Sequence, residues 1–196
     1  MTVSDPLGHV LGAMRLIAPG GAAGSKTLVD LAGPPWRVDA ARAAAAAGLD
    51  PEGTWDIATL VTRASTTGSG TRLSLALVHG LVQVARVNAA ASFTAVLDER
   101  VRRLLNGFGA VTRTLPGART APYLGSAAST PVYLDMPSTM DAQRRDVPDS
   151  YRLVSLGVGL DGVSVPPPSH FRLRPLEQPV AIDLRTPAPS AARAAG

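Results

Sequence analysis

Asp56 stands at the head of the apolar segment W-D-I-A-T-L-V-T, residues 55 to 62. The β-branched residues of this segment, bounded by Gly53 and a Ser/Thr/Gly cluster, predict a largely buried strand. A partly buried carboxylate at the start of a strand can accept the proton that an attacking nucleophile loses. The alternative is structural, because Asp56 can equally be a solvated residue or a turn cap where the strand begins.

Arg15 is the charged residue in a second apolar segment, G-A-M-R-L-I, residues 12 to 17. A buried guanidinium without a partner is too costly, so Arg15 must reach solvent, pair with a carboxylate or face a ligand. An ion pair with Asp56 across neighbouring strands would satisfy both residues. Three hypotheses stay open: Arg15 binds a substrate carboxylate, orients Asp56, or forms a structural salt bridge.

The loop S-T-T-G-S-G-T, residues 65 to 71, precedes the longest helical pattern of the chain. Backbone N–H groups of such a loop and of the following helix can bind a phosphate or pyrophosphate. The candidate residues, flanked by two arginines, are Arg63, Gly68, Ser69, Gly70, Thr71 and Arg72. The alternative is an ordinary helix cap at Ser69 or Thr71.

Other catalytic classes find little support in the sequence. The chain has no cysteine, its three histidines are far apart, and no His/Asp/Glu spacing indicates a metal site. His79 lies within an apolar helical pattern, where a packed histidine is more common than a catalytic one. The serines lack the G-x-S-x-G context of a hydrolase.

The composition is that of one globular domain with a basic surface. Of 196 residues, 45% are hydrophobic, and the net charge of +4 comes almost entirely from arginine. We expect a domain over residues 1 to 186 and a disordered Ala/Pro/Ser-rich tail over 187 to 196.

The arginines are scattered and aromatics are few, so we expect an acidic protein or cofactor as partner rather than nucleic acid. No apolar run approaches the ~20 residues that span a bilayer, which makes a cytoplasmic protein the expectation.

Strand and helix patterns alternate along the chain and predict an α/β fold. Strands are expected at 9–17, 55–62, 92–97, 110–115 and 131–136. Helices are expected at 25–31, 39–47, 71–87 and 99–107, the third from the stripe Leu73, Leu77, Leu81 and Val84. Asp39 and Asp98 are expected to cap the helices at 39–47 and 99–107. The latter helix should carry an outward basic face of Arg100, Arg102 and Arg103, which is either merely solvated or docks an acidic carrier protein.

Several weak motifs together resemble a known family. GAMRLI (12–17), WDIATLVTR (55–63) and FTAVLDERVRRLLNGFGAVTRTL (93–115) are similar to segments of acyl-homoserine-lactone synthases and N-acyl amino acid synthases, and Tyr123-Leu124-Gly125 and Pro131-Val132-Tyr133 continue the likeness. The resemblance covers residues 10 to 136. It implies a GNAT-like acyltransferase fold, a mixed central sheet flanked by helices.

The resemblance also implies an activity, transfer of an acyl group from a thioester to the amine of an amino acid or related metabolite. Asp56 and Arg15 would be catalytic, and Leu60 and Val61 would join the loop candidates in binding the thioester. The donor would be acyl-CoA or acyl-phosphopantetheine, the latter on an acyl carrier protein, and no metal would be needed.

The chain departs from the family pattern at four places. Position 56 holds aspartate in place of the more usual glutamate. Thr59 stands where the family often has arginine, and Ser65 stands where it prefers glutamine or arginine. The chain also begins almost on the GAMRLI segment, so the first strand of the fold is expected to be missing or altered. These departures favour an alternative, a non-catalytic protein that keeps the scaffold to bind a ligand or partner.

Overall fold

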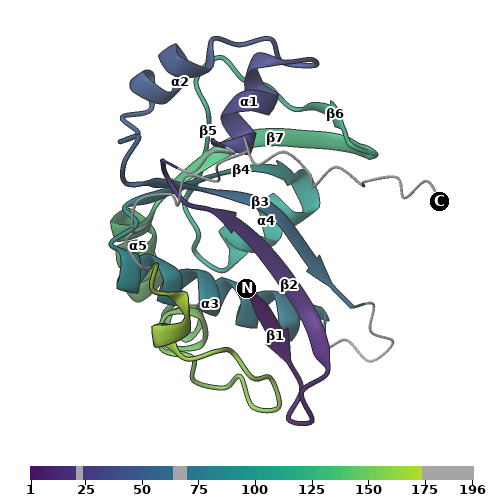
Figure 1. The fold of residues 1–196 in the computed structure, drawn as a ribbon, viewed down its shortest axis with the longest axis vertical. Helices are drawn as coiled ribbons and strands as arrows, with labels where there is room; N and C mark the ends of the chain where they lie inside the picture. Colours follow the sequence, from purple (N-terminus) through teal and green to yellow (C-terminus); the bar gives the residue numbers. More distant parts are fainter. Residues whose placement is uncertain (21–23, 64–69, 174–196) are drawn as a thin grey trace, which may run out of the picture.

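The computed structural model describes residues 1–20, 24–63 and 70–173. One sheet of seven strands runs through the molecule in the order β1-β2-β3-β4-β7-β5, with β6 also on β7 (Figure 1). The strands are β1 (Thr2–Ser4), β2 (Val10–Ile17), β3 (Thr54–Thr62), β4 (Ser92–Asp98), β5 (Thr112–Thr114), β6 (Ala121–Tyr123) and β7 (Ser126–Asp135). The helices are α1 (Lys26–Ala32), α2 (Ala40–Ala46), α3 (Gly70–Asn88), α4 (Glu99–Gly107), α5 (Met136–Asp146) and α6 (Pro148–Ser150), followed by a π turn (Tyr151–Ser155) and a 3-10 turn (Pro168–Phe171). The predicted mixed sheet flanked by helices is thus confirmed.

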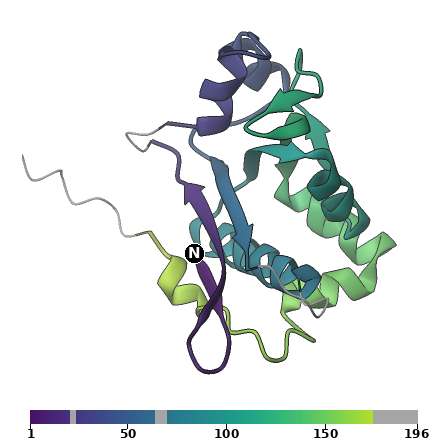
Figure 2. The same ribbon diagram turned by 90° about the vertical axis from the view of Figure 1, so that its right-hand side faces the viewer.

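Two hydrophobic clusters fill the two sides of the sheet. The larger joins the sheet to α3 and α5 through Met14, Trp55, Leu77, Phe93 and Met136, all buried. The smaller joins α1 and α2 to the opposite side through Leu31, Trp36 and Leu115. Figure 2 shows the indigo helices α1 and α2 at the top, apart from the teal and green helices.

The sheet divides in its middle. β3 and β4 form its parallel pair, and their pairing runs only from Thr54 to Ile57 opposite Ser92 to Ala95. Beyond that point β3 stays with β2, while β4 stays with β7 along its whole length (Figure 1). The register of β2 and β3 also shifts here, leaving Ala58 as an extra residue between the pairs of Ile57 and Thr59. Such a bulge bends a strand, which accounts for β3 turning away from β4.

Local sequence signals explain most of the helices and the strands next to them. Ser25, Asp39 and Asp98 accept hydrogen bonds from the first turns of α1, α2 and α4, so the caps predicted at Asp39 and Asp98 are confirmed. The long helix predicted at 71–87 is α3. The strand predicted at 131–136 is wrong in length, because β7 begins at Ser126 and its last strand residue is Asp135.

Several elements were not predicted, among them β1, β6 and α5. β1 precedes the GAMRLI strand and pairs antiparallel with it, so a strand of 3 residues stands where the first strand was expected to be missing or altered. β6 turns into β7 at Leu124 and Gly125, both with positive φ. α5 follows β7 directly, capped by Asp135 with Pro137 in its first turn. The predicted tail at 187–196 lies outside the described residues.

Candidate active site at the divided sheet

Asp56 lies where β3 and β4 begin to separate, and its side chain is only 1% exposed. Its Oδ2 accepts three hydrogen bonds: Ser25 Oγ donates at 2.7 Å, the Thr27 backbone N–H at 2.8 Å and Thr94 Oγ1 at 3.0 Å. These donors come from the start of α1 and from β4. They fix the orientation of the carboxylate.

The other oxygen of Asp56 is exceptional. Oδ1 is buried and has no hydrogen-bond partner among the described residues. A buried, unpaired carboxylate oxygen is costly, and such atoms in folded proteins call for an explanation, of which a catalytic role is one. With Oδ2 saturated and Oδ1 unbonded, the carboxylate is arranged to accept a proton or a hydrogen bond from a ligand.

Two hollows reach Asp56. The first, which we call the acidic hollow, has a volume of about 220 Å³ and lies between α1, β3, β4 and the β6–β7 turn. Its charged lining residues are Lys26, Asp30, Asp56 and Asp98. The second hollow, about 200 Å³, is mostly apolar and is lined by Ile17, Leu28 and Leu49 beside Asp56.

An apolar cavity of about 60 Å³ lies on the other side of the sheet. It sits under the divergent strands and is enclosed by side chains of α3, α4 and α5, among them Val82, Val101 and Met140. Leu60 lines it, whereas its neighbour Val61 is exposed. Ile57 borders both this cavity and the acidic hollow, so the two spaces approach each other where β3 leaves β4.

The predicted ion pair between Arg15 and Asp56 is wrong for the described chain. The two residues lie on adjacent strands, but Arg15 is opposite Thr59 and is exposed, and no ion pair joins it to Asp56. Thr59 is three residues beyond Asp56, about 10 Å along a strand. Arg15 reaches solvent instead, one of the outcomes its sequence context allowed, and any catalytic role for it is an untested hypothesis.

The phosphate-binding candidates are only partly described. Gly68 and Ser69 lie outside the described residues. Gly70, Thr71 and Arg72 form the first turn of α3, with Thr71 and Arg72 exposed, and Arg63 is exposed just after β3. β3 ends and α3 begins on the same side of the molecule, the side toward which the gap between β3 and β4 widens (Figure 1).

The basic face predicted on α4 is only partly correct. Arg100 and Arg103 are exposed, but Arg102 turns toward the sheet, where it contacts Glu99 at 3.3 Å and the hydroxyls of Thr112 and Thr114. His79, the mid-helix histidine, makes a 2.8 Å hydrogen bond from Nδ1 with the Val154 carbonyl, as a packed histidine would.

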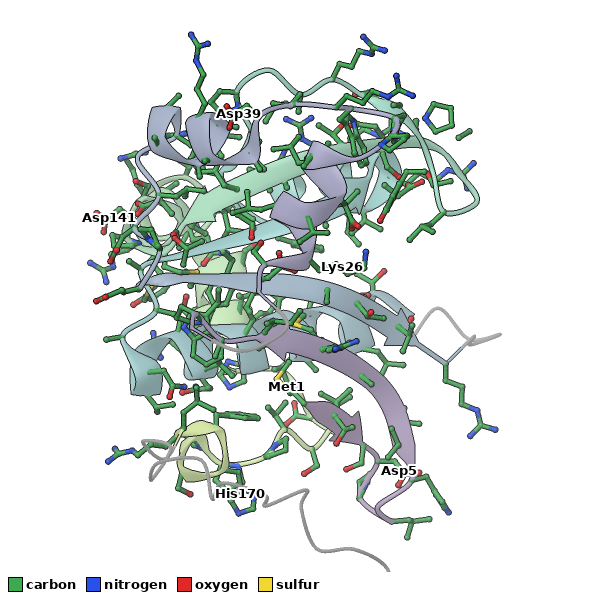
Figure 3. All side chains as sticks on the ribbon, turned by 45° about the horizontal axis from the view of Figure 1, so that its top comes forward. Met1, Asp5, Lys26, Asp39, Asp141 and His170 are labelled. Atoms are coloured by element: carbon green, nitrogen blue, oxygen red, sulfur yellow. The ribbon has the colours of Figure 1, made fainter. Side chains whose placement is uncertain are left out.

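Sequence reasoning missed the residues that share the acidic hollow with Asp56. Lys26, the one lysine of the chain, forms an ion pair with Asp30 and donates to Tyr123 Oη at 3.0 Å; it is labelled at the start of α1 in Figure 3. Burial, together with the neighbouring Asp30, raises the pKa of Tyr123 and keeps this phenol neutral. The i, i+4 spacing of Lys26 and Asp30 was the one available signal.

Among the described residues, no helix is long and apolar enough to cross a membrane, and no three His, Asp or Glu side chains gather to hold a metal ion.

No protein-family model matches the chain, and no curated protein matches its sequence significantly. Several solved structures are similar to it. The acyl-homoserine-lactone synthase LasI matches with a TM-score of 0.47 and 14% identity over 65% of this chain. The CoA-dependent synthase BjaI, solved with SAM and isopentyl-CoA, matches with a TM-score of 0.44 and 15% identity over 70%, and the CoA-dependent synthase MesI with 0.45 and 17% over 70%.

The chain spans 59% of the LasI and BjaI chains and 63% of MesI. These structures belong to the acyl-homoserine-lactone synthases, the group that the sequence motifs resemble.

The hydrogen bond from Thr94 to Asp56 gives a prediction for stability. Thr94→Val keeps the shape of the side chain but removes one of the three donors to a buried carboxylate. We expect a loss of about 1–3 kcal/mol in the free energy of unfolding, measured by urea denaturation. In an Asp56→Asn background the same substitution should cost less, because the charged acceptor is gone. Thr59→Val, exposed on β3, is the control and should stay within about 0.5 kcal/mol. Equal losses in both backgrounds would show that Thr94 does not stabilise the carboxylate.

Proposed function

We propose that this protein is an N-acyltransferase that moves an acyl group from a thioester to a small amine at the gap between β3 and β4. The proposal depends chiefly on one observation. A buried carboxylate, one oxygen of which has no partner among the described residues, lies at the separating strands, with a polar hollow on its side of the sheet and an apolar cavity on the other. An acyl transfer to an amine needs these three parts, a base, an acceptor site and an acyl site.

In this account the acyl chain occupies the apolar cavity and the acceptor amine occupies the acidic hollow. The thioester carbonyl then lies near Ile57, which borders both spaces. The rest of the bound thioester donor extends along the gap toward the first turn of α3, where Gly70, Thr71 and Arg72 could contact its phosphate. The donor is acyl-CoA or an acyl carrier protein, and Arg100 and Arg103 on α4 offer charge for an acidic carrier.

The reaction follows from these positions. The amine nitrogen attacks the thioester carbonyl carbon while Asp56 Oδ1 takes the proton that the nitrogen loses. The tetrahedral intermediate collapses with cleavage of the C–S bond, and the departing thiolate takes up the proton held by Asp56, which gives an amide and a thiol and restores the carboxylate. Beyond Ile57 the edge of β3 that faces β4 is unpaired, so its backbone N–H groups can donate to the developing oxyanion.

Asp56→Asn tests the base. The substitution keeps the size of the side chain and most hydrogen bonding, but it removes the basic oxygen. We expect acyl transfer to an amine to fall by roughly 10²–10⁴, with thioester binding little changed. The deficit should shrink at higher pH, where more of the acceptor amine is already deprotonated.

The control for this experiment is Asp141→Asn on α5, an exposed carboxylate that lines none of the three spaces. Circular dichroism on the same preparations separates loss of folding from loss of catalysis. Near wild-type turnover of a folded Asp56→Asn variant at neutral pH would contradict the role of Asp56 as base.

Val101→Phe tests the acyl site. Val101 on α4 lines the apolar cavity and is half-buried, so a larger side chain there fills the cavity with little disturbance of the core. We expect kcat/KM for an octanoyl thioester to fall by about tenfold or more, with that for the acetyl thioester nearly unchanged. Leu104→Phe, on the same helix but outside the cavity lining, is the matched control. An equal effect on both thioesters would place the acyl chain elsewhere.

A further inference from the structure

The acidic hollow carries a net negative charge. Three carboxylates and one ammonium line it, which leaves a charge of −2. The ammonium of Lys26 is already engaged by Asp30 and by Tyr123. Arg15, the arginine of β2, lines neither this hollow nor the mostly apolar hollow beside it. Among the described lining residues, therefore, no positively charged side chain is free to bind a carboxylate of the acceptor.

Asp98 is the second anionic group with capacity for a ligand. Ser126 Oγ donates to its Oδ2 at 2.6 Å and the Arg100 backbone N–H donates to its Oδ1 at 2.8 Å. The hydrogen bond from Ser126, with that from Arg100, holds the pKa of Asp98 below its usual value. The carboxylate is consequently ionised at neutral pH, and each oxygen keeps a lone pair for a further donor.

The two carboxylates stand on the two strands that separate. Asp56 is paired in register with Thr94, and Asp98 is four residues further along β4. At 3.2–3.4 Å per residue, about 13 Å of strand divides the two positions. An acceptor that spans the hollow therefore meets an anion at each end. At one end is the buried Oδ1 of Asp56, which no described residue hydrogen-bonds, and at the other is Asp98.

We propose that the acceptor is a linear diamine or polyamine, with its reacting nitrogen at Asp56 and a second, protonated nitrogen at Asp98. This inference rests on the proposed acyl transfer and specifies its acceptor. The negative hollow repels the carboxylate of a free amino acid and attracts a dication. The reacting nitrogen gives one proton to solvent and attacks as the neutral amine, then loses a second proton to Asp56 as the amide forms. The C–S bond breaks, the thiolate takes up that proton and leaves as the thiol, and the distal ammonium stays protonated throughout.

The test compares spermidine with octylamine, which has a similar length but no second charge, and with methionine as a free amino acid. With wild-type protein and an acyl-CoA we expect kcat/KM for spermidine to exceed that for each of the others by about tenfold or more. Asp98→Asn should reduce the ratio of kcat/KM for spermidine to kcat/KM for octylamine by about tenfold. Asparagine is as good a helix cap as aspartate, so α4 is retained.

Asp135→Asn is the matched control, because Asp135 caps α5 in the same way but lines none of the three spaces. It should change neither the rate nor the ratio. Calorimetric titration of spermidine into the protein without donor gives a second readout: Kd should rise about tenfold in Asp98→Asn and not in Asp135→Asn.

The outcomes separate the two claims. Preferential acylation of methionine would overturn the polyamine acceptor and leave acyl transfer standing. Spermidine binding that depends on Asp98, without acylation of any amine, would support the site and contradict the proposed function. Spermidine binding that Asp98→Asn does not weaken would overturn the inference whatever the activity.

Discussion

The early end of pairing between β3 and β4 is the constraint on which the rest of the structure depends. β3 follows β2 and β4 follows β7, so the sheet has two halves that share only four paired positions. The bulge at Ala58 bends β3 at the point where this shared pairing ends. Backbone groups on the facing edges are left without a strand partner, a condition tolerated in proteins where a ligand or solvent can satisfy them. The apolar cavity and the acidic hollow lie on opposite sides of this gap.

Asp56 depends on the same geometry. Asp56 is the last but one residue of β3 that pairs with β4, and this position brings Thr94 Oγ1 of β4 to 3.0 Å from Asp56 Oδ2. The start of α1 supplies the other two donors. Three donors to one oxygen offset much of the cost of burying a carboxylate, and they act on Oδ2 alone. The cost of burying Oδ1 without a hydrogen bond remains unless a ligand binds there. A folded protein that retains such a group trades stability for a prepared site, a common arrangement at active sites.

The sequence revealed what short-range physics controls. The helix α3 and the caps at Asp39 and Asp98 follow from local patterns and are confirmed. Asp56 was predicted near the start of a largely buried strand and lies there, on β3. Arg15 was placed on the correct neighbouring strand, but its partner was wrong because the bulge at Ala58 and the strand register come from pairing between distant segments. β6, the full length of β7 and the gathering of Lys26, Asp30 and Asp98 around Asp56 likewise depend on contacts remote in sequence. Asp98 could be recognised as a cap, whereas its place in the hollow required the structure.

The most direct test of the divided sheet as an acyl-transfer site is a crystal structure with a non-hydrolysable acyl-CoA analogue. We predict that the acyl chain lies in the apolar cavity between α3, α4 and α5, that the carbonyl passes between β3 and β4 beside Ile57, and that Asp56 Oδ1 faces it from the acidic hollow. An analogue bound elsewhere on the molecule, with the gap between β3 and β4 unchanged, would contradict the account.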